Sequence, residues 1–187
     1  DMGVATFSVL SFIYSFANAI LSGISQGLQP LWGQAFGRKD RGDLLGYLGA
    51  GLKIDLISAA VIYGILFIFR VPAVALFNGD PELVKMASEA LPFFAVSFLF
   101  MAVNLIFTAY FYSTKQTVRS DVIAVSRGIV IKAAAIFMIP MIFGSEFVWH
   151  SVAAAEGVTL VICLACWKMP PSGPVCEILA SSKNDRA

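Results

Sequence analysis

Long apolar stretches separated by short polar segments dominate the pattern of the chain. Each stretch reaches or exceeds the roughly 20 residues that an α-helix needs to cross a hydrocarbon layer about 30 Å thick. Glycine and proline interrupt several of them, which membrane helices tolerate because neighbouring helices satisfy the freed backbone groups. The pattern predicts five transmembrane helices, over Val4–Phe36, Leu44–Phe69, Leu83–Ser113, Val122–Phe143 and Val148–Trp167.

The composition argues against a soluble domain. The chain of 187 residues is 58% hydrophobic and only 13% charged, which is far from the averages of soluble proteins. A soluble domain of this length could not bury five such surfaces. We therefore expect an all-α, polytopic membrane helix bundle over residues 1–169, followed by a disordered cytoplasmic tail over residues 170–187, where proline, glycine and mixed polar residues gather.

Lysine and arginine fall on alternate sides of the predicted helices. One side carries Arg70 and Lys85, diluted by acidic residues. The other side carries Arg38, Lys39, Arg41, Lys115, Arg119, Arg127, Lys168, Lys183 and Arg186. Cationic loops are retained in the cytoplasm, so the chain is predicted to start outside an inner or plasma membrane and to end inside. The net charge of +1 and the dispersed basic residues give no reason to expect nucleic acid as a partner.

The N-terminal end indicates a longer protein. The chain opens with Asp1 rather than an initiator methionine and enters an apolar helix directly. No cationic segment with a small-residue cleavage site precedes that helix, so it does not resemble a signal peptide. We expect a C-terminal fragment of a longer polytopic protein.

The start and course of the third predicted helix can be read from local chemistry. Asp80 is suited to be the N-cap, Pro81 to occupy the first helical position, and Glu82 to favour the helix dipole. Pro92 is expected to kink the helix.

The second half of the first predicted helix is rich in glycine. Gly23 and Gly27, and again Gly33 and Gly37, form small-xxx-small pairs that let another helix approach closely. Pro30 cannot donate to the carbonyl group four residues earlier and predicts a kink. Helix packing with a kink is the simpler interpretation of these positions.

Three glutamines, Gln26, Gln29 and Gln34, lie in the same segment. Neutral polar side chains are costly when they face lipid but useful along a water-filled cavity. A structural role and a place on a substrate or ion pathway both stay open for them.

Two motifs resemble a known family. Gly23, Gly27, Pro30, Gln34 and Gly37, followed by a basic loop, resemble the second helix of a lobe in the multidrug and toxic compound extrusion (MATE) family. The segments 139–144, 148–151 and 155–156 are similar to the junction between the eleventh and twelfth helices of that family. The end of the third predicted helix, 109–113, departs from the glutamine-rich, glycine-containing pattern usual there. The resemblance covers about residues 23–167, most of the chain.

This resemblance implies twelve helices in two lobes of six, and antiport of organic cations or other xenobiotics against sodium ions or protons. The five helices would be the eighth to the twelfth, forming most of one six-helix lobe. The implied partners are the missing N-terminal lobe, the lipid bilayer and small organic cations. No cofactor is expected besides the coupling ion, sodium or proton.

A few polar groups inside the predicted spans are candidates for a substrate or ion pathway, because ionisable residues in a membrane usually face a cavity or a partner. They are Asp55, Asn104, Lys132 and Glu156, with Tyr110 and also Tyr14 and Tyr63 as aromatic residues that could line a drug cavity. Lys53 is expected to reach the cytoplasmic interface with its long side chain. For Asp55 we favour a structural ion pair over ion coupling.

A direct contact between Lys132 and Glu156 is expected inside the lobe. The fourth and fifth predicted helices are joined by a very short loop, so they should be antiparallel neighbours. Counted from that loop, the two charges lie at similar depths, and a pair would offset much of the cost of burying them. Asp55 is the competing partner for Lys132.

The sequence gives no support to an enzyme. It contains no phosphate-binding glycine loop, nucleophile elbow or metal-ligand cluster. Cys163 and Cys166 have redox spacing but lie in an apolar helix and are expected to be small fillers, and His150 is a lone interface residue.

Two alternatives to multidrug export stay open. One is a lipid-linked glycan flippase or exporter of the same superfamily, which would need a basic cavity to which only Lys53 and Lys132 could readily contribute. The other is a non-transporting membrane scaffold, against which the charges at Asp55, Lys132 and Glu156 argue.

Overall fold

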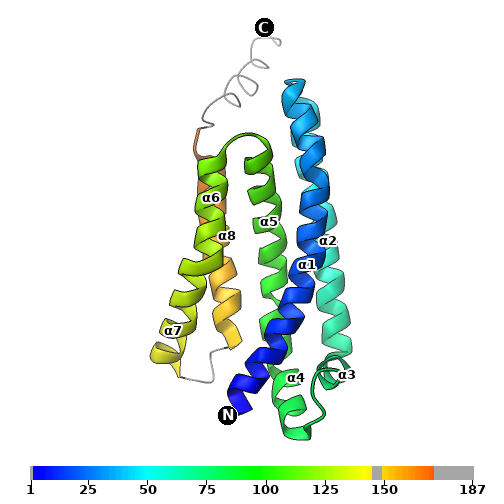
Figure 1. Ribbon diagram of the computed structural model, residues 1–187, viewed down its shortest axis with the longest axis vertical. Coiled ribbons are helices and arrows are strands. Elements are labelled where there is room, and N and C mark those ends of the chain that lie inside the picture. Colours follow the sequence, from blue (N-terminus) through cyan, green and yellow to red (C-terminus); the bar gives the residue numbers. More distant parts are fainter. Residues whose placement is uncertain (1, 145–148, 171–187) are drawn as a thin grey trace.

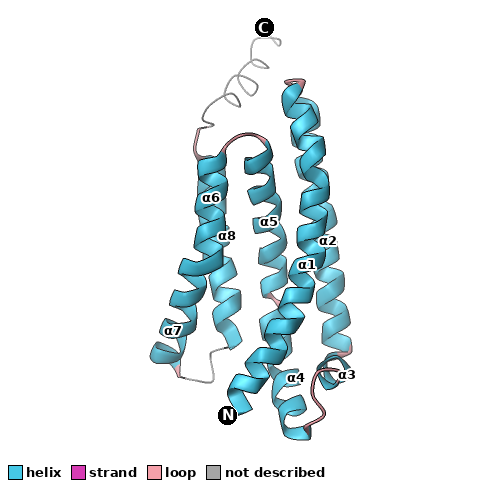
Figure 2. Cartoon of the chain, viewed as in Figure 1, coloured by secondary structure: helices cyan, strands magenta, loops and turns pink. Residues whose placement is uncertain are grey.

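The computed structural model describes residues 2–144 and 149–170. These residues form helices without any strand in the two ranges, as Figure 2 shows. The elements are α1 (Met2–Gly37), α2 (Arg41–Ile68), α3 (Arg70–Ala75), α4 (Pro81–Ala95), α5 (Ser97–Ser113), α6 (Thr117–Val125), the π-helical segment η1 (Ser126–Val130), α7 (Ile131–Phe143) and α8 (Ser151–Lys168). The predicted tail lies outside the described residues except for Pro170.

The long helices run side by side in an elongated bundle with α5 at its centre (Figure 1). Helix α5 contacts α1 and α2 on one side and α6 and α8 on the other. Helices α6, η1 and α7 continue one another and pack against α8. Helices α1 and α6 therefore lie on either side of α5.

The all-α membrane fold predicted from hydropathy is confirmed. In the described residues, four helical spans are long and apolar enough to cross a membrane, and the bent pair of α4 and α5 supplies a fifth. These four spans are Met2–Gly37, Arg41–Ile68, Thr117–Ile139 and Ser151–Lys168. The protein is an integral membrane protein.

The bend in the third span differs in place from the prediction. Helices α4 and α5 meet at an angle of 42°, but the break lies at Val96, four residues beyond Pro92. Pro92 itself stays within α4, where its missing N–H leaves the preceding turn short of one hydrogen bond. The helix therefore bends about one turn after Pro92 rather than at the proline itself.

Side-chain caps fix where two helices begin. The Asp80 carboxylate accepts hydrogen bonds from the backbone N–H groups of Glu82 at 2.9 Å and Leu83 at 3.5 Å, with Pro81 at the first helical position, as predicted. Asp40 caps α2 in the same way, through the N–H of Asp43 at 3.0 Å. Both caps satisfy donors that the helix itself leaves unpaired.

Two lysines end helices at the same end of the bundle. Lys39 and Lys115 each adopt a left-handed backbone with φ of 59°. Beside them, the N–H of Asp40 reaches the carbonyl of Ala35, and that of Gln116 reaches the carbonyl of Phe111, both at 2.9 Å. These are the bonds of a Schellman motif, with lysine where glycine is usual. The two basic turns and the end of α8 lie at the same end of the bundle (Figure 1).

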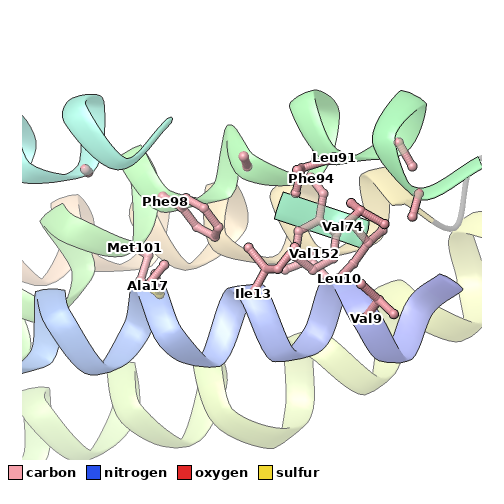
Figure 3. Close-up of a cluster of buried hydrophobic side chains, with 14 of the residues drawn as sticks. Val9, Leu10, Ile13, Ala17, Val74, Leu91, Phe94, Phe98, Met101 and Val152 are labelled. Carbon is pink, nitrogen blue, oxygen red and sulfur yellow. The ribbon is translucent and has the colours of Figure 1, made fainter. Parts of the chain in front are cut away.

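Hydrophobic packing forms two clusters along the bundle. In the first, Figure 3 shows Ile13 and Ala17 of α1 directed toward Phe98 and Met101 of α5. The second, nearer the basic turns, gathers Trp32, Leu44, Ile106, Tyr110 and Cys163 among others. Helices α1, α2, α5 and α8 all contribute to both clusters, and α5 contacts each of the other three.

The prediction that the glycine pairs of the first helix admit a neighbouring helix is wrong for the described structure. A Cβ atom at Gly23, Gly27, Gly33 or Gly37 would meet nothing within 4 Å. The close approach occurs at Gly51 of α2 instead, where a Cβ would lie 2.7 Å from Leu28 Cδ1. The glycine stripe therefore lies on an outer face of α1.

Candidate functional site

A carboxylate without solvent exposure is the centre of the most polar site. Glu156, on α8, has an exposed fraction of 0%. The Tyr14 hydroxyl donates to its Oε1 at 2.5 Å, and the Asn104 Nδ2 donates to its Oε2 at 3.0 Å and to its backbone oxygen at 3.1 Å. Arg127 Nε lies 3.0 Å from Oε1 and 3.2 Å from Oε2. Each of these three neighbours therefore donates a hydrogen bond to the Glu156 side chain.

The two cations of the site share the hydroxyl of Tyr14. Arg127 Nη2 donates to Asn18 Oδ1 at 2.8 Å and to the Tyr14 oxygen at 3.4 Å. Lys132 Nζ donates to the same oxygen at 2.8 Å and lies 4.1 Å from the centre of the Tyr14 ring. We call Tyr14, Asn18, Asn104, Arg127, Lys132 and Glu156 the charged cluster.

Five elements of the fold bring the charged cluster together. Tyr14 and Asn18 are four residues apart on α1 and therefore share a face of that helix. Asn104 comes from the central α5 and Glu156 from α8, which pack against each other. Arg127 lies in η1, where the wider π-turn changes the direction in which successive side chains point. Lys132 follows at the start of α7.

Two cavities open beside the cluster. The first has a volume of about 240 Å³ and is lined by Tyr14, Asn18, Thr108, Ala124, Arg127, Gly128 and Lys132. The second, of about 400 Å³, is lined by Ser22, Ser25, Gln26, Gln29, Leu105, Thr108, Ala109, Tyr112, Ser120, Asp121 and Ala124. We call the first the basic cavity and the second the polar cleft. They are adjacent, because Thr108 and Ala124 line both.

The glutamines and aromatic residues predicted for a pathway are divided between cleft, surface and core. Gln26 and Gln29 line the polar cleft. Pro30 and Gln34 are exposed and line neither cavity. Tyr110 is buried in the hydrophobic core, with its ring edge-to-face against Trp32 at 6.0 Å, and it too lines neither cavity.

The expected direct pair of Lys132 with Glu156 is wrong. Glu156 forms its salt bridge with Arg127, and Lys132 reaches the carboxylate only through the Tyr14 hydroxyl. The two charges do lie at a similar depth and face the same cluster. Arg127, which the charge pattern assigned to the cytoplasmic flank, is closer to the carboxylate because η1 carries it inward.

The expected structural ion pair of Asp55 is also not found. Asp55 is fully buried on α2, and neither of its carboxylate oxygens has a hydrogen-bond partner among the residues that the structure describes. It is not the partner of Lys132, which bonds Tyr14. A buried carboxylate without a donor is costly and therefore invites a functional explanation.

Sequence reasoning missed Arg127 and Asn18 as members of the site. Arg127 lies about ten residues beyond the basic turn that precedes α6, too far along a helix to serve as a flank charge. Tyr14 and Asn18, spaced by one helical turn on an otherwise apolar segment, were the other available signal.

Comparisons with known proteins support the family resemblance. A family model described as MatE matches residues 1–138. The Multidrug export protein MepA of Staphylococcus haemolyticus (strain JCSC1435) is 26% identical over 163 residues, which cover 84% of this chain and 34% of the relative. MepA of Staphylococcus aureus (strain bovine RF122 / ET3-1) is 24% identical over 167 residues, covering 84% and 35%. The chain thus spans about a third of the length of these curated relatives, and no solved structure matches it.

Proposed function

Because the chain belongs to the MatE family of multidrug and toxic compound extrusion proteins, we propose that it forms most of one lobe of a secondary transporter that exports xenobiotics. The relatives named as multidrug export proteins support this proposal. In such a machine the missing first lobe supplies the opposite wall of the substrate pathway, and a gradient of sodium ions or protons drives export. The basic turns after α1 and α5 then face the cytoplasm.

The observation that carries the proposal is the charged cluster with its adjoining polar cleft. Ionisable side chains inside membrane spans are rare and mark pathways for substrates or ions. Here Arg127, Lys132 and the carboxylate of Glu156 lie in one cluster. The basic cavity and the polar cleft extend beside them along α1. A passive scaffold has no need of such an arrangement, because its helices could pack with apolar residues alone.

Within this function we assign the coupling step to Asp55 rather than Glu156. The two oxygens of Glu156 are already occupied by donors from Tyr14, Asn104 and Arg127. Asp55 has both oxygens without a described donor, so a proton or a sodium ion has no competitor there. A carboxylate that alternates between bound and free cation is what a coupled antiporter requires.

The complete transporter that contains this chain tests the proposal in liposomes. Efflux of a fluorescent organic cation such as ethidium is followed while an inward proton or sodium gradient is imposed. We expect gradient-driven efflux that Asp55→Asn abolishes, with Asp43→Asn as the matched control because Asp43 is an exposed carboxylate at the start of α2. Efflux that does not respond to either gradient would refute the proposal, and full coupling in Asp55→Asn would remove the assignment to Asp55.

The isolated chain should not transport. One lobe supplies one wall of a central pathway, and alternating access needs the partner repeat. Residues 1–187 reconstituted alone should therefore show no gradient-driven dye efflux, and measurable efflux by them would contradict the division into two lobes.

A further inference from the structure

The charged cluster is unequal in charge. It contains two cations, Arg127 and Lys132, and a single carboxylate, Glu156. The salt bridge engages Arg127 with that carboxylate, so the ammonium group of Lys132 is left with the Tyr14 hydroxyl and ring as its contacts. The cluster therefore carries one uncompensated positive charge within a membrane span, where such a charge is costly.

The cations also have donor capacity to spare. A lysine ammonium has three N–H donors, and among the described residues the Tyr14 hydroxyl is the one acceptor that Lys132 reaches. Arg127 uses Nε and Nη2, and none of the described residues accepts from its Nη1. Both side chains line the basic cavity, so unused donors border a space of about 240 Å³.

The polar cleft next to this cavity has a different character. Gln26, Gln29 and the serine hydroxyls are neutral, and Asp121 is its only carboxylate. Asp121 precedes Arg127 by six residues, which corresponds to about 9 Å along a helix. An organic molecule that extends from the basic cavity would therefore enter a cleft that carries no cation, with its body against α1 and α6.

From this charge and donor excess, we propose that the basic cavity binds the carboxylate group of an anionic organic substrate, with Lys132 as its principal ligand and Arg127 as the second donor. The inference rests on the proposed function, because it adds a subsite for a carboxylate group to the substrate pathway of this lobe. The Tyr14 hydroxyl positions the ammonium group of Lys132, and the salt bridge to Glu156 holds the guanidinium of Arg127 at the edge of the cavity. Organic cations are disfavoured at this end of the pathway by repulsion from the same two side chains.

Two dyes with one fluorophore and opposite charge test this site. Dansylglycine carries a carboxylate and dansylcadaverine an ammonium group, and fluorescence titration of the 187-residue chain in detergent measures the affinity of each. We expect dansylglycine to bind and Lys132→Gln to weaken its binding about ten- to hundredfold, the range of a hydrogen bond to a charged group. Lys132→Arg should keep most of the affinity, because it keeps the charge and the donors.

The control variant is Lys53→Gln, which removes a lysine from the exposed face of α2 outside both cavities. Lys53→Gln should leave the affinity for dansylglycine unchanged. Lys132→Gln should not weaken the binding of dansylcadaverine. If dansylglycine fails to bind the wild-type chain, or binds Lys132→Gln as well as wild type, the proposal is overturned. Circular dichroism of each variant verifies that the helices are retained, and Lys132→Arg covers the case in which Lys132→Gln does not fold.

This binding result is independent of the transport assay. Gradient-driven ethidium efflux without dansylglycine binding would leave the proposed function standing and remove only the carboxylate site. Dansylglycine binding that depends on Lys132, without any gradient-driven efflux by the complete transporter, would support the site and contradict the function.

Discussion

Neutralising Glu156 should be the most destabilising single change in the polar part of the bundle. Glu156→Gln keeps the size of the side chain but replaces one oxygen by an NH₂ group. Arg127 Nε faces both oxygens, while Tyr14 and Asn104 each donate to one of them. Whichever way the amide turns, its NH₂ group meets donors, and Arg127 loses its counter-charge.

The size of the effect follows from burial. Glu156 has an exposed side-chain fraction of 0% and Arg127 one of 17%. Removing one partner of such a buried pair costs about 3–5 kcal/mol. For a chain of this size, 1 kcal/mol corresponds to a shift in the melting midpoint of about 2–4 °C. We therefore expect Glu156→Gln to lower the midpoint by about 6–20 °C.

The buried thiols of α8 provide the assay. Cys163 and Cys166 are buried and free, so a maleimide dye that fluoresces on reaction reports when α8 becomes accessible on heating. A Cys176→Ser background removes the third cysteine of the chain. The matched control is Asp43→Asn, which breaks the exposed pair of Arg38 and Asp43, 2.7 Å apart with side chains 57% and 44% exposed. Exposed pairs of this kind contribute about 0–1 kcal/mol.

A double-mutant cycle separates the pair from its surroundings. Arg127→Gln alone should also be destabilising, because it removes the direct salt-bridge partner of a buried carboxylate. The double variant should lose clearly less than the two single losses added together, since neither charge is then left alone. The reasoning is refuted if Glu156→Gln lowers the midpoint no more than Asp43→Asn does, or if the two single effects simply add.

Three further changes test the fold and its use. Gly51→Ala should lower the free energy of unfolding by at most about 1–3 kcal/mol, and with it the melting midpoint, because the added Cβ would lie 2.7 Å from Leu28 Cδ1. Gly49→Ala is the control and should leave the midpoint unchanged, because a Cβ there meets nothing within 4 Å. Equal effects of the two substitutions would contradict the packing. Asp55→Asn should raise the midpoint in the same thiol assay, because a buried amide is less costly than a buried carboxylate without a donor; a lower midpoint would mean that the carboxylate has a partner. Pro30→Ala should restore a hydrogen bond to the carbonyl group of Gln26 and impair drug efflux by the complete transporter while expression is kept; unchanged drug resistance in cells would show that the proline is merely tolerated.

Hydropathy predicts the spans well because the energy of placing a helix in a membrane is summed over some 20 residues. Helix caps are predictable because they depend only on neighbouring residues. Asp80 accepts hydrogen bonds from N–H groups two and three residues away, so no distant part of the chain affects the cap. The prediction from the glycine pairs was wrong because the spacing of small residues shows where a helix has room to approach, not whether one does. In the described structure the approach occurs at Gly51.

The partners of Glu156 could not be predicted from depth alone. Counting residues from a loop gives the height of a side chain along its helix, but the direction around the helix decides which groups meet. The segment Ser126–Val130 is π-helical, and one extra residue in a turn rotates everything beyond it by about 100° relative to a regular helix. Arg127 therefore replaces Lys132 as the direct partner, and no feature of the apolar sequence around it announces the π-turn.

Asp55 and Glu156, the two buried carboxylates among the described residues, have opposite surroundings, which fits the different roles that the proposed function gives them. Glu156 is bonded to groups from α1, α5 and η1 at once, so it joins the side of the bundle that holds α8 to the side that holds α1. In the proposed transporter the lobe rocks as a unit, and such a joint would keep its two sides moving together when access alternates. Asp55 lies on α2 outside this network, without a described donor, and can change its bound cation without dissolving the joint. In the proposed function, exchange of a bound cation at Asp55 therefore leaves the bonds of Glu156 to α1, α5 and η1 in place, whereas exchange at Glu156 would break them in every cycle.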